Sequence, residues 1–523
     1  MPVGTNIIAA QAKLSMQSDS KTIIFLSVVL FAVIAVGAAV MRGGWLDEFE
    51  SLTFTDPAQS VSALYKSYWM TDVNAPAYYF LLRLWRGVAA PYSGLIATRS
   101  LSVIAAFVFA IVATYAYGKF VGGRLWIFVA LLLSSPVVLL YAGEARSYVF
   151  SVFGGVFLGI MFLACLSGER LERRRFVAIA LMGLFGGLLC SVHLISVLTA
   201  AFFLGCLGAI AVWEQYWRTA LLAACLIVLT ILPGLAATVL LTTGIQNAVS
   251  SFWITRRIVL ESLIWLPAFV GLPTCLLMLA LIWKRSFTLK LLADPVLRPA
   301  FFALGAAFAF AILAFGIAAV KPFLTVRYLS TWAGFMVPAV ATIIDVALKR
   351  TELRVVRFAT IAVALCFVID TAAAWPRGLG EWRAPGYYVS SIPECRGATI
   401  PVALLDFVPN DAQMKRFAIA FAYYAGNGDR FVPANQANLE RLAMQPCPIR
   451  LWLGHLKAPR FLSDEVLAAI AKVCGSDAVD VLEFDLGFLF VSPSNRAPPM
   501  AGSHTTCSAV MDEFQVNQRV SAQ

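Results

Sequence analysis

The stretch of residues 22–50 reads TIIFLSVVLFAVIAVGAAVMRGGWLDEFE. Its first twenty residues carry no charge, and roughly 20 apolar residues are what a helix needs to cross a bilayer. Acidic residues follow this segment almost at once. The stretch therefore predicts a membrane-spanning helix that leads directly into a strongly polar loop.

The rest of the chain has the same character. Its 523 residues are 60% hydrophobic and only 13% charged, and the mean hydropathy is +0.81. These values exclude an ordinary soluble globule. We predict a polytopic α-helical membrane protein with about eleven transmembrane helices, near residues 22–41, 95–118, 125–142, 148–166, 176–192, 195–213, 219–241, 261–283, 299–320, 329–348 and 357–374.

Hydropathy falls after Trp375, where short apolar runs alternate with stretches that have helical character. This pattern predicts a small α/β soluble domain. The predicted organisation is therefore an N-terminal segment (1–21), a transmembrane domain (22–374) that includes a long loop (42–94), and a soluble domain (375–523).

Lysine and arginine in short loops stay on the cytoplasmic side during membrane insertion. If the N-terminus is cytoplasmic, five predicted inner loops hold such residues, among them Arg173 to Arg175 and Lys284 with Arg285. The loop 42–94 and the C-terminal domain then lie outside. Much of the net charge of +11 reflects this topology and contact with anionic lipid headgroups, so the charge does not indicate a nucleic-acid binder.

The ten cysteines fall into two groups. Six lie in or beside predicted spans and are expected to pack as small apolar residues. The others, Cys395, Cys447, Cys474 and Cys507, lie in the exported domain, where an oxidising compartment permits pairing in three connectivities. The cysteines show no metal-ligand spacing, and no cofactor is predicted. The absence of any N-x-[ST] sequon favours a bacterial envelope over the secretory pathway, and we predict a location in the bacterial inner membrane.

Strongly polar residues gather on the predicted outer face. The acidic pair Asp47 and Glu48 follows the first span, and the same loop continues with an interfacial helix near Asn74 and Tyr78. A solvated loop start and an interfacial anchor are the plainer interpretations of these two segments. Further outer candidates are Glu144, Arg146, His193, Arg256, Arg257, Lys321, Arg327 and Arg383.

The outer cations run against the usual inner bias, which indicates that they meet an anion. Lysine supplies a point charge, and arginine supplies a planar fork that can grip a phosphate with two hydrogen bonds. A lipid phosphate ester suits this set of groups. The carboxylates would then deprotonate an acceptor hydroxyl while fixed cations stabilise a departing phosphate.

Four segments make the chain resemble the C-type (GT-C) integral-membrane glycosyltransferases, in the group of protein O-mannosyltransferases and lipid A aminoarabinose transferases. The family has an acidic Asp-Glu pair just after its first span, which Asp47-Glu48 match. It also has a segment like His-Pro-Pro-Leu-Tyr-Tyr, which residues Asn74 to Tyr79 match. Glu-Ala-Arg-x-Tyr matches Glu144 to Tyr148, and Arg-Tyr after Pro-Phe matches Arg327-Tyr328. The segment Trp382-Arg383-Ala384 is also similar to the start of the family's outer tail, whereas Asn74-Ala75 departs from its His-Pro.

The resemblance implies an inverting transferase that moves one sugar from a polyprenyl-phosphate-linked donor to an envelope acceptor, such as lipid A, another glycan or a protein. Asp47 would be the base or would orient the acceptor, with Glu48 assisting. Arg146, Lys321 and Arg327 would hold the donor phosphate, and Glu144 would orient Arg146 or the sugar. Metal dependence varies in the superfamily, and none is predicted.

Two other functions stay open at the level of sequence. A sugar-chain ligase or polymerase would use a diphosphate-linked donor. A secondary transporter or lipid flippase would have a similar number of spans, although such proteins place ionisable residues near the bilayer midplane and often consist of two repeated halves. The chain contains no evident repeat.

Overall fold

A computed structural model describes the chain over residues 4–70, 72, 74–89, 94–167, 172–241, 259–264, 266, 295–349, 365, 369, 382–404, 408–426, 430–454, 463–476, 479–484, 487–492 and 503–510. The chain divides into two compact units. The first, here called the membrane unit, comprises Met1–Val40 and Thr55–Trp375. The second, the tail unit, comprises Met41–Phe54 and Pro376–Gln523, so the segment after the first span groups with the C-terminal domain.

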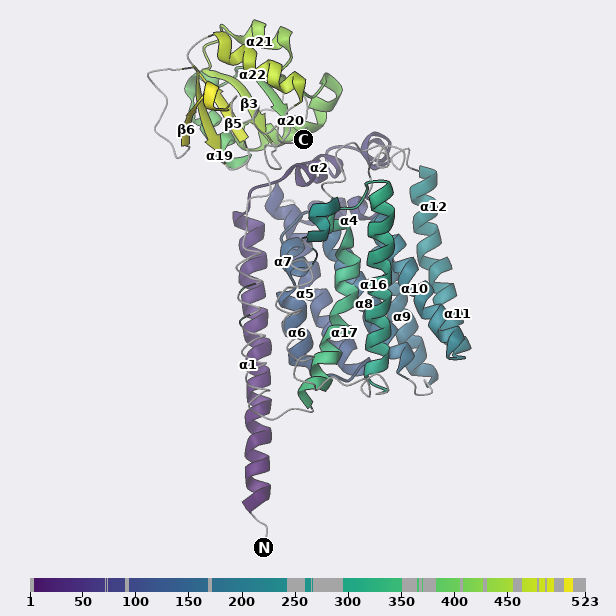
Figure 1. Cartoon of the computed structure of the whole chain (residues 1–523). Coiled ribbons are helices and arrows are strands. Elements are labelled where there is room, and N and C mark those ends of the chain that lie inside the picture. Colours follow the sequence, from purple (N-terminus) through teal and green to yellow (C-terminus); the bar gives the residue numbers. More distant parts are fainter. Residues whose placement is uncertain are drawn as a thin grey trace. The chain divides into compact units, whose positions relative to one another are not determined.

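Helices make up the described part of the membrane unit, and most run side by side as a bundle (Figure 1). They are α1 (Gly4–Met41), α3 (Val61–Leu64), α4 (Pro76–Val88), α5 (Leu95–Phe120), α6 (Leu125–Ser134), α7 (Pro136–Ala142), α8 (Tyr148–Leu166), α9 (Arg173–Cys190), α10 (Leu194–Trp213), α11 (Trp217–Leu226), α12 (Leu232–Leu241), α16 (Leu297–Val320) and α17 (Ser330–Lys349). Shorter turns are η1 (Tyr65–Trp69), η2 (Ile227–Ile231) and η5 (Val326–Leu329).

Seven helices in the described residues are long and apolar enough to cross a membrane, or eight if α6 and α7 form one broken span. The protein is thus a multi-pass membrane protein. The predicted count of about eleven is not confirmed: α9 forms at its predicted place but is not among these helices. Most of the predicted spans 261–283 and 357–374 lies outside the described residues.

The predicted span 125–142 is broken. Its two halves, α6 and α7, meet at an angle of 57°. Pro136 begins α7, and Ser135 before it has an extended ψ of 123°. Proline disfavours helical geometry in the residue that precedes it, which explains the position of the break.

Helix α8 lies in the core of the membrane unit, because all of its residues are buried. Close backbone contact with α17 requires glycine on both helices. A Cβ on Gly155 would lie 2.1 Å from the carbonyl oxygen of Thr331, and one on Gly334 would lie 2.0 Å from that of Val152. Small residues permit such approaches between membrane helices, where van der Waals packing drives association.

The tail unit contains a mixed six-stranded sheet with the strand order β2-β1-β3-β5-β4-β6. Its strands are β1 (Ile400–Leu404), β2 (Phe431–Pro433), β3 (Ile449–Gly454), β4 (Asp480–Phe484), β5 (Gly487–Val491) and β6 (Ser503–Thr506). Strand β1 pairs in parallel with β2 and β3, and the remaining pairs are antiparallel. The predicted α/β character of the tail is confirmed.

Helices cover the sheet of the tail unit: α19 (Arg383–Ser391), α20 (Asp411–Ala425), α21 (Gln436–Leu442) and α22 (Asp464–Ser476). Alternate side chains of β3 point to opposite faces, as in any strand. Leu451 and Leu453 join the apolar core that includes Leu439 of α21 and Ile470 of α22. Trp452 instead meets Phe421 of α20, with ring centroids 4.9 Å apart.

Two disulfides, Cys395–Cys447 and Cys474–Cys507, close chain segments of 52 and 33 residues in the tail unit. They select one of the three connectivities that the sequence left open. Cross-links of this kind stabilise a small domain chiefly by restricting its unfolded chain.

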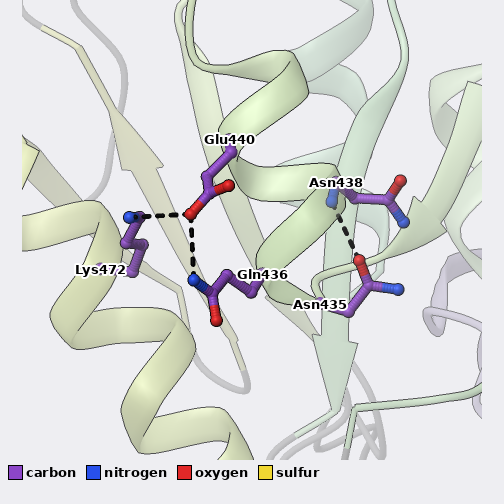
Figure 2. A network of polar contacts seen from close by, with 5 residues as sticks. All are labelled: Asn435, Gln436, Asn438, Glu440 and Lys472. Carbon is purple, nitrogen blue, oxygen red and sulfur yellow. Dashed lines mark hydrogen bonds and ion pairs between the residues drawn. The ribbon is translucent and has the colours of Figure 1, made fainter.

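A surface network joins α21 to α22 (Figure 2). The Asn435 side chain accepts a hydrogen bond from the backbone N–H of Asn438 at 2.9 Å and so caps α21. Glu440 accepts hydrogen bonds from Gln436 at 3.0 Å and from Lys472 of α22 at 3.1 Å. These bonds lower the pKa of Glu440 and keep it ionised at neutral pH.

Candidate functional site

The acidic pair lies in the first turn of α2 (Leu46–Phe54), within the tail unit. Glu48 is fully buried, and its carboxylate accepts a hydrogen bond from the backbone N–H of Trp45 at 3.4 Å. The N–H of Glu48 in turn donates to the carbonyl oxygen of Trp45 at 3.0 Å. Glu48 thus satisfies a backbone donor at the start of the helix, in the manner of a capping box.

Asp47 differs from its neighbour because its side chain is partly exposed. Its place in the first turn of α2 puts an acidic side chain near the positive end of the helix dipole, where such residues are favourable. Of the two acids, Asp47 is therefore the more exposed residue.

Arg383, another candidate from the sequence, begins α19 of the tail unit and is exposed. Its guanidinium donates to the carbonyl oxygen of Met41 at 3.1 Å. This contact ties the start of α19 to the chain just before α2, so Arg383 has an evident structural role.

A buried polar network lies at one end of the membrane unit, around Asn74. The side-chain amide of Asn74 donates to Asp72 at 3.1 Å and to the hydroxyl of Tyr79 at 3.2 Å, while its oxygen accepts from Ser147 at 3.0 Å. The Tyr79 hydroxyl also donates to Asp72. Because each polar group has partners, the network fixes the start of α4 against the turn that precedes α8.

His193 lies next to this network, between α9 and α10. A β-bridge pairs its backbone with that of Asn74. The imidazole is buried between two tyrosine rings, with centroids 5.3 Å from Tyr148 and 5.4 Å from Tyr328. Neither ring nitrogen has a hydrogen-bond partner among the described residues. Such unmet hydrogen-bonding capacity in a buried group needs an explanation.

The charge state of His193 follows from its surroundings. Burial, and then the positive charges of Arg146 and Arg327, lower its pKa from 6.5 to about 3. The imidazole is therefore neutral at physiological pH, with one nitrogen able to donate a hydrogen bond and the other able to accept one. Two fixed cations and a neutral imidazole consequently converge at this end of the helix bundle.

Glu144 and Arg146 lie in the turn between α7 and α8, and both side chains are buried. This turn lies close to α1, since a Cβ on Gly143 would come within 2.7 Å of the Cβ of Ala38. A buried charge is costly unless other groups compensate it. The turn thus holds a buried carboxylate and a buried guanidinium two residues apart.

The remaining cations differ in position. Arg327 lies in η5, just before α17, and is partly buried. Lys321 is exposed at the end of α16. Arg256 and Arg257 lie outside the described residues.

The structure brings Asn74, His193, Arg146 and Arg327 together from four separate segments of the membrane unit. Tyr78 is buried nearby on α4, with its ring 5.6 Å from that of Tyr79. Asp47, Glu48 and Arg383 belong to the tail unit.

Three network members, Asp72, Tyr79 and Ser147, were not candidates in the sequence analysis. Tyr79 and Ser147 lie inside the two motifs that contain Asn74 and Arg146, and Asp72 lies two residues before the first of these motifs, so the motifs and their flanks were the available signal. Within the described residues, no three His, Cys, Asp or Glu side chains form a group that could hold a metal ion.

Comparison with solved structures identifies the fold. The chain is similar to ArnT from Cupriavidus metallidurans bound to undecaprenyl phosphate, with a TM-score of 0.55 and 14% identity over 91% of this chain and 99% of that one. The apo structure of the same transferase gives a TM-score of 0.54 at 13% identity, with the same coverage. This chain has the fold of ArnT.

A more distant likeness is to the archaeal oligosaccharyltransferase AglB from Archaeoglobus fulgidus in complex with an inhibitory peptide and a dolichol-phosphate. The TM-score is 0.42 at 12% identity, over 94% of this chain and 76% of that one. No protein-family model and no curated protein sequence matches the chain. The fold assignment therefore rests on the similarity to the two ArnT structures.

Proposed function

We propose that this protein is an inverting glycosyltransferase that moves a single sugar from a polyprenyl-phosphate-linked donor to a hydroxyl group of an envelope acceptor. The acceptor is lipopolysaccharide or lipid A, another glycan, or a protein. The reaction takes place on the outer face of a bacterial inner membrane, with the N-terminus in the cytoplasm and the tail unit outside. No metal or other cofactor takes part in the proposal.

One observation carries the proposal. His193 is buried with both ring nitrogens lacking a hydrogen-bond partner in the described residues, and the charges of Arg146 and Arg327 act on it. Two cations with a neutral donor and acceptor suit the oxygens of a phosphate. The fold similarity to a transferase whose structure contains undecaprenyl phosphate supports a lipid-linked phosphate as this ligand.

The charges also suit the chemistry of the transfer. A phosphodiester donor carries one negative charge, and the departing phosphate monoester approaches two because its second pKa is about 6. Two fixed guanidinium groups therefore match the product side of the reaction better than the donor. Preorganised charge of this kind lowers the barrier, since it acts where negative charge develops. We assign Arg146 and Arg327 to the phosphate, with Lys321, Arg256 and Arg257 as further cations for the same lipid.

Asp47 acts as the base in the proposed mechanism. Its carboxylate takes the proton of the acceptor hydroxyl as the oxygen bonds to the anomeric carbon, and the bond from that carbon to the phosphate oxygen breaks. The bonding electron pair leaves with the polyprenyl phosphate. A single displacement of this kind inverts the anomeric configuration. Glu48 supports Asp47 by capping the start of α2.

The test compares the envelope glycolipids and glycans of cells with and without the gene by mass spectrometry. The proposal predicts that deletion removes the mass of one sugar from one acceptor class, and that the wild-type gene restores it. Loss of an entire sugar chain would instead indicate a ligase or polymerase with a diphosphate-linked donor. An unchanged set of glycans, together with ion-coupled uptake by the purified protein in vesicles, would identify a transporter and refute the proposal.

A further inference from the structure

Helix α2, which carries Asp47, is short. It has nine residues, and isolated helices shorter than about 12 to 15 residues are marginal in water. Its conformation and direction must therefore come from contacts with other parts of the protein. Helix α20 of the tail unit provides such contacts.

Phe49 makes the central contact. Its side chain is fully buried, and its ring lies 5.3 Å from that of Tyr423 and 6.3 Å from that of Tyr424, both on α20. The ring of Trp382 approaches it edge-on at 6.3 Å. Aromatic pairs with these separations and angles are favourable beyond the area that they bury.

The residues around Phe49 are themselves part of the tail core. The ring centroid of Trp382 lies 4.6 Å from that of Phe421 and 6.4 Å from that of Trp452 on β3. Gly454, at the end of β3, leaves the space that Trp382 fills, because a Cβ there would lie 2.6 Å from the indole ring. Phe49 is thus anchored through Trp382 to the central part of the sheet.

Two hydrogen bonds hold the chain that enters α2. The backbone N–H of Gly44 donates to the hydroxyl of Tyr424 at 3.1 Å, and Arg383 donates to the carbonyl oxygen of Met41 at 3.1 Å. The rotation of α2 about its axis follows from the Phe49 contact. Asp47 and Phe49 are two residues apart, which places their side chains roughly 200° apart around a helix. Burial of Phe49 in the tail core therefore turns Asp47 away from that core.

We propose that the tail unit positions helix α2 for catalysis. Phe49, Trp382 and Tyr424 are positioning residues that set the orientation of Asp47 for sugar transfer. This inference rests on the proposed function. It gives the tail unit a role in the rate of the reaction, beyond the acceptor recognition or stability that a soluble domain of this kind suggests. It also explains why a segment next to the first span groups with residues more than 300 positions away.

The test uses Phe49→Ala, Phe49→Leu and Tyr424→Phe in the full-length protein. Hydrogen–deuterium exchange in detergent micelles measures the order of residues 46–54, and restoration of the missing sugar in complemented cells measures transfer. We expect Phe49→Ala to speed exchange in α2 and to slow transfer, each by about tenfold or more. Phe49→Leu should recover most of both. Tyr424→Phe, which keeps the ring and removes the acceptor of the Gly44 bond, should have a smaller effect in the same direction.

Phe431→Leu is the matched control. The ring centroid of Phe431 lies 5.7 Å from that of Phe421 and 5.9 Å from that of Trp452. The Phe431→Leu substitution therefore changes the same aromatic core at a position other than the Phe49 contact. It should leave exchange in α2 unchanged and transfer within about twofold. The inference is overturned if Phe49→Ala loosens α2 but transfers sugar at the wild-type rate. It is also overturned if Phe49→Ala leaves exchange in α2 unchanged, or if Phe431→Leu slows transfer as much as Phe49→Ala.

Asp47→Asn separates this inference from the proposed function. It should abolish transfer while exchange in α2 stays as in the wild type. An active Asp47→Asn protein would refute the assigned base and leave the packing of α2 on the tail unit intact. If Asp47→Asn is inactive and Phe49→Ala is fully active, the positioning role of the tail unit is refuted and the assigned base stands.

Discussion

At the scale of single residues, His193 is the most unusual group in the membrane unit. Its pKa is lowered to about 3, whereas an unfolded chain binds that proton near pH 6.5. The unfolded state therefore gains a proton that the folded state lacks as pH falls from 6.5 toward 3, and stability is lost over that window, by about 1.4 kcal/mol per pH unit at most. We predict that His193→Gln removes this contribution. Thermal unfolding in detergent at pH 7.5 and pH 5 measures it.

The two proteins should differ most in the pH dependence of Tm. Acidification should lower the Tm of the wild type more than that of His193→Gln. Equal shifts would show that His193 titrates normally in the folded protein and would contradict its burial between Tyr148 and Tyr328. The sequence could place His193 at the outer end of a span, because hydropathy locates helix ends. It could not predict the bridge to Asn74, because residues 119 positions apart pair through tertiary structure.

At the scale of elements, the contact between α8 and α17 depends on glycine. A methyl group at Gly334 would meet the backbone of Val152 at 2.0 Å, and backbone atoms cannot yield as a flexible side chain can. We predict that Gly334→Ala separates the helices, and that it lowers both the amount of protein in the membrane and its Tm by about 5 °C or more. Fluorescence-detected size-exclusion chromatography after heating measures both.

Gly305→Ala on α16 is the matched control, since no atom lies within 4 Å of a Cβ at that position. It should behave as the wild type. A Gly334→Ala protein that is as abundant and as stable as Gly305→Ala would contradict the close packing of α8 on α17. Hydropathy alone predicted both helices, but their partners depend on which glycines face each other, and periodicity does not reveal this in helices that are apolar on every side.

At the scale of the whole molecule, the account requires the tail unit to lie outside the cell membrane. We predict that Ala437→Cys, an exposed position on α21, reacts with a membrane-impermeant maleimide in intact cells. Lys119 is exposed near the C-terminal end of α5, in a predicted inner loop. Lys119→Cys should therefore react only after the membrane is permeabilised. Wild-type protein supplies the background from its native cysteines. If only Lys119→Cys were labelled in intact cells, the orientation in the membrane would be opposite to the predicted one.

The fold class was predictable because hydropathy, loop charge and the order of short motifs are properties of local sequence. Membership of α2 in the tail unit was not, since it depends on the contact of Phe49 with Trp382, 333 positions away. The choice between Asp47 and Glu48 lies between these cases. Sequence shows two adjacent acids, and structure shows that Glu48 is buried and caps the helix whereas Asp47 is partly exposed.

Sugar transfer by Asp47→Asn measures whether Asp47 is the base. Deletion cells that express wild type, Asp47→Asn or Glu48→Gln at equal membrane levels are compared by mass spectrometry of the envelope acceptor. The account predicts that Asp47→Asn leaves the sugar entirely absent, because an amide cannot accept the hydroxyl proton, and that Glu48→Gln retains part of the activity. Full restoration of the sugar by Asp47→Asn would contradict the account.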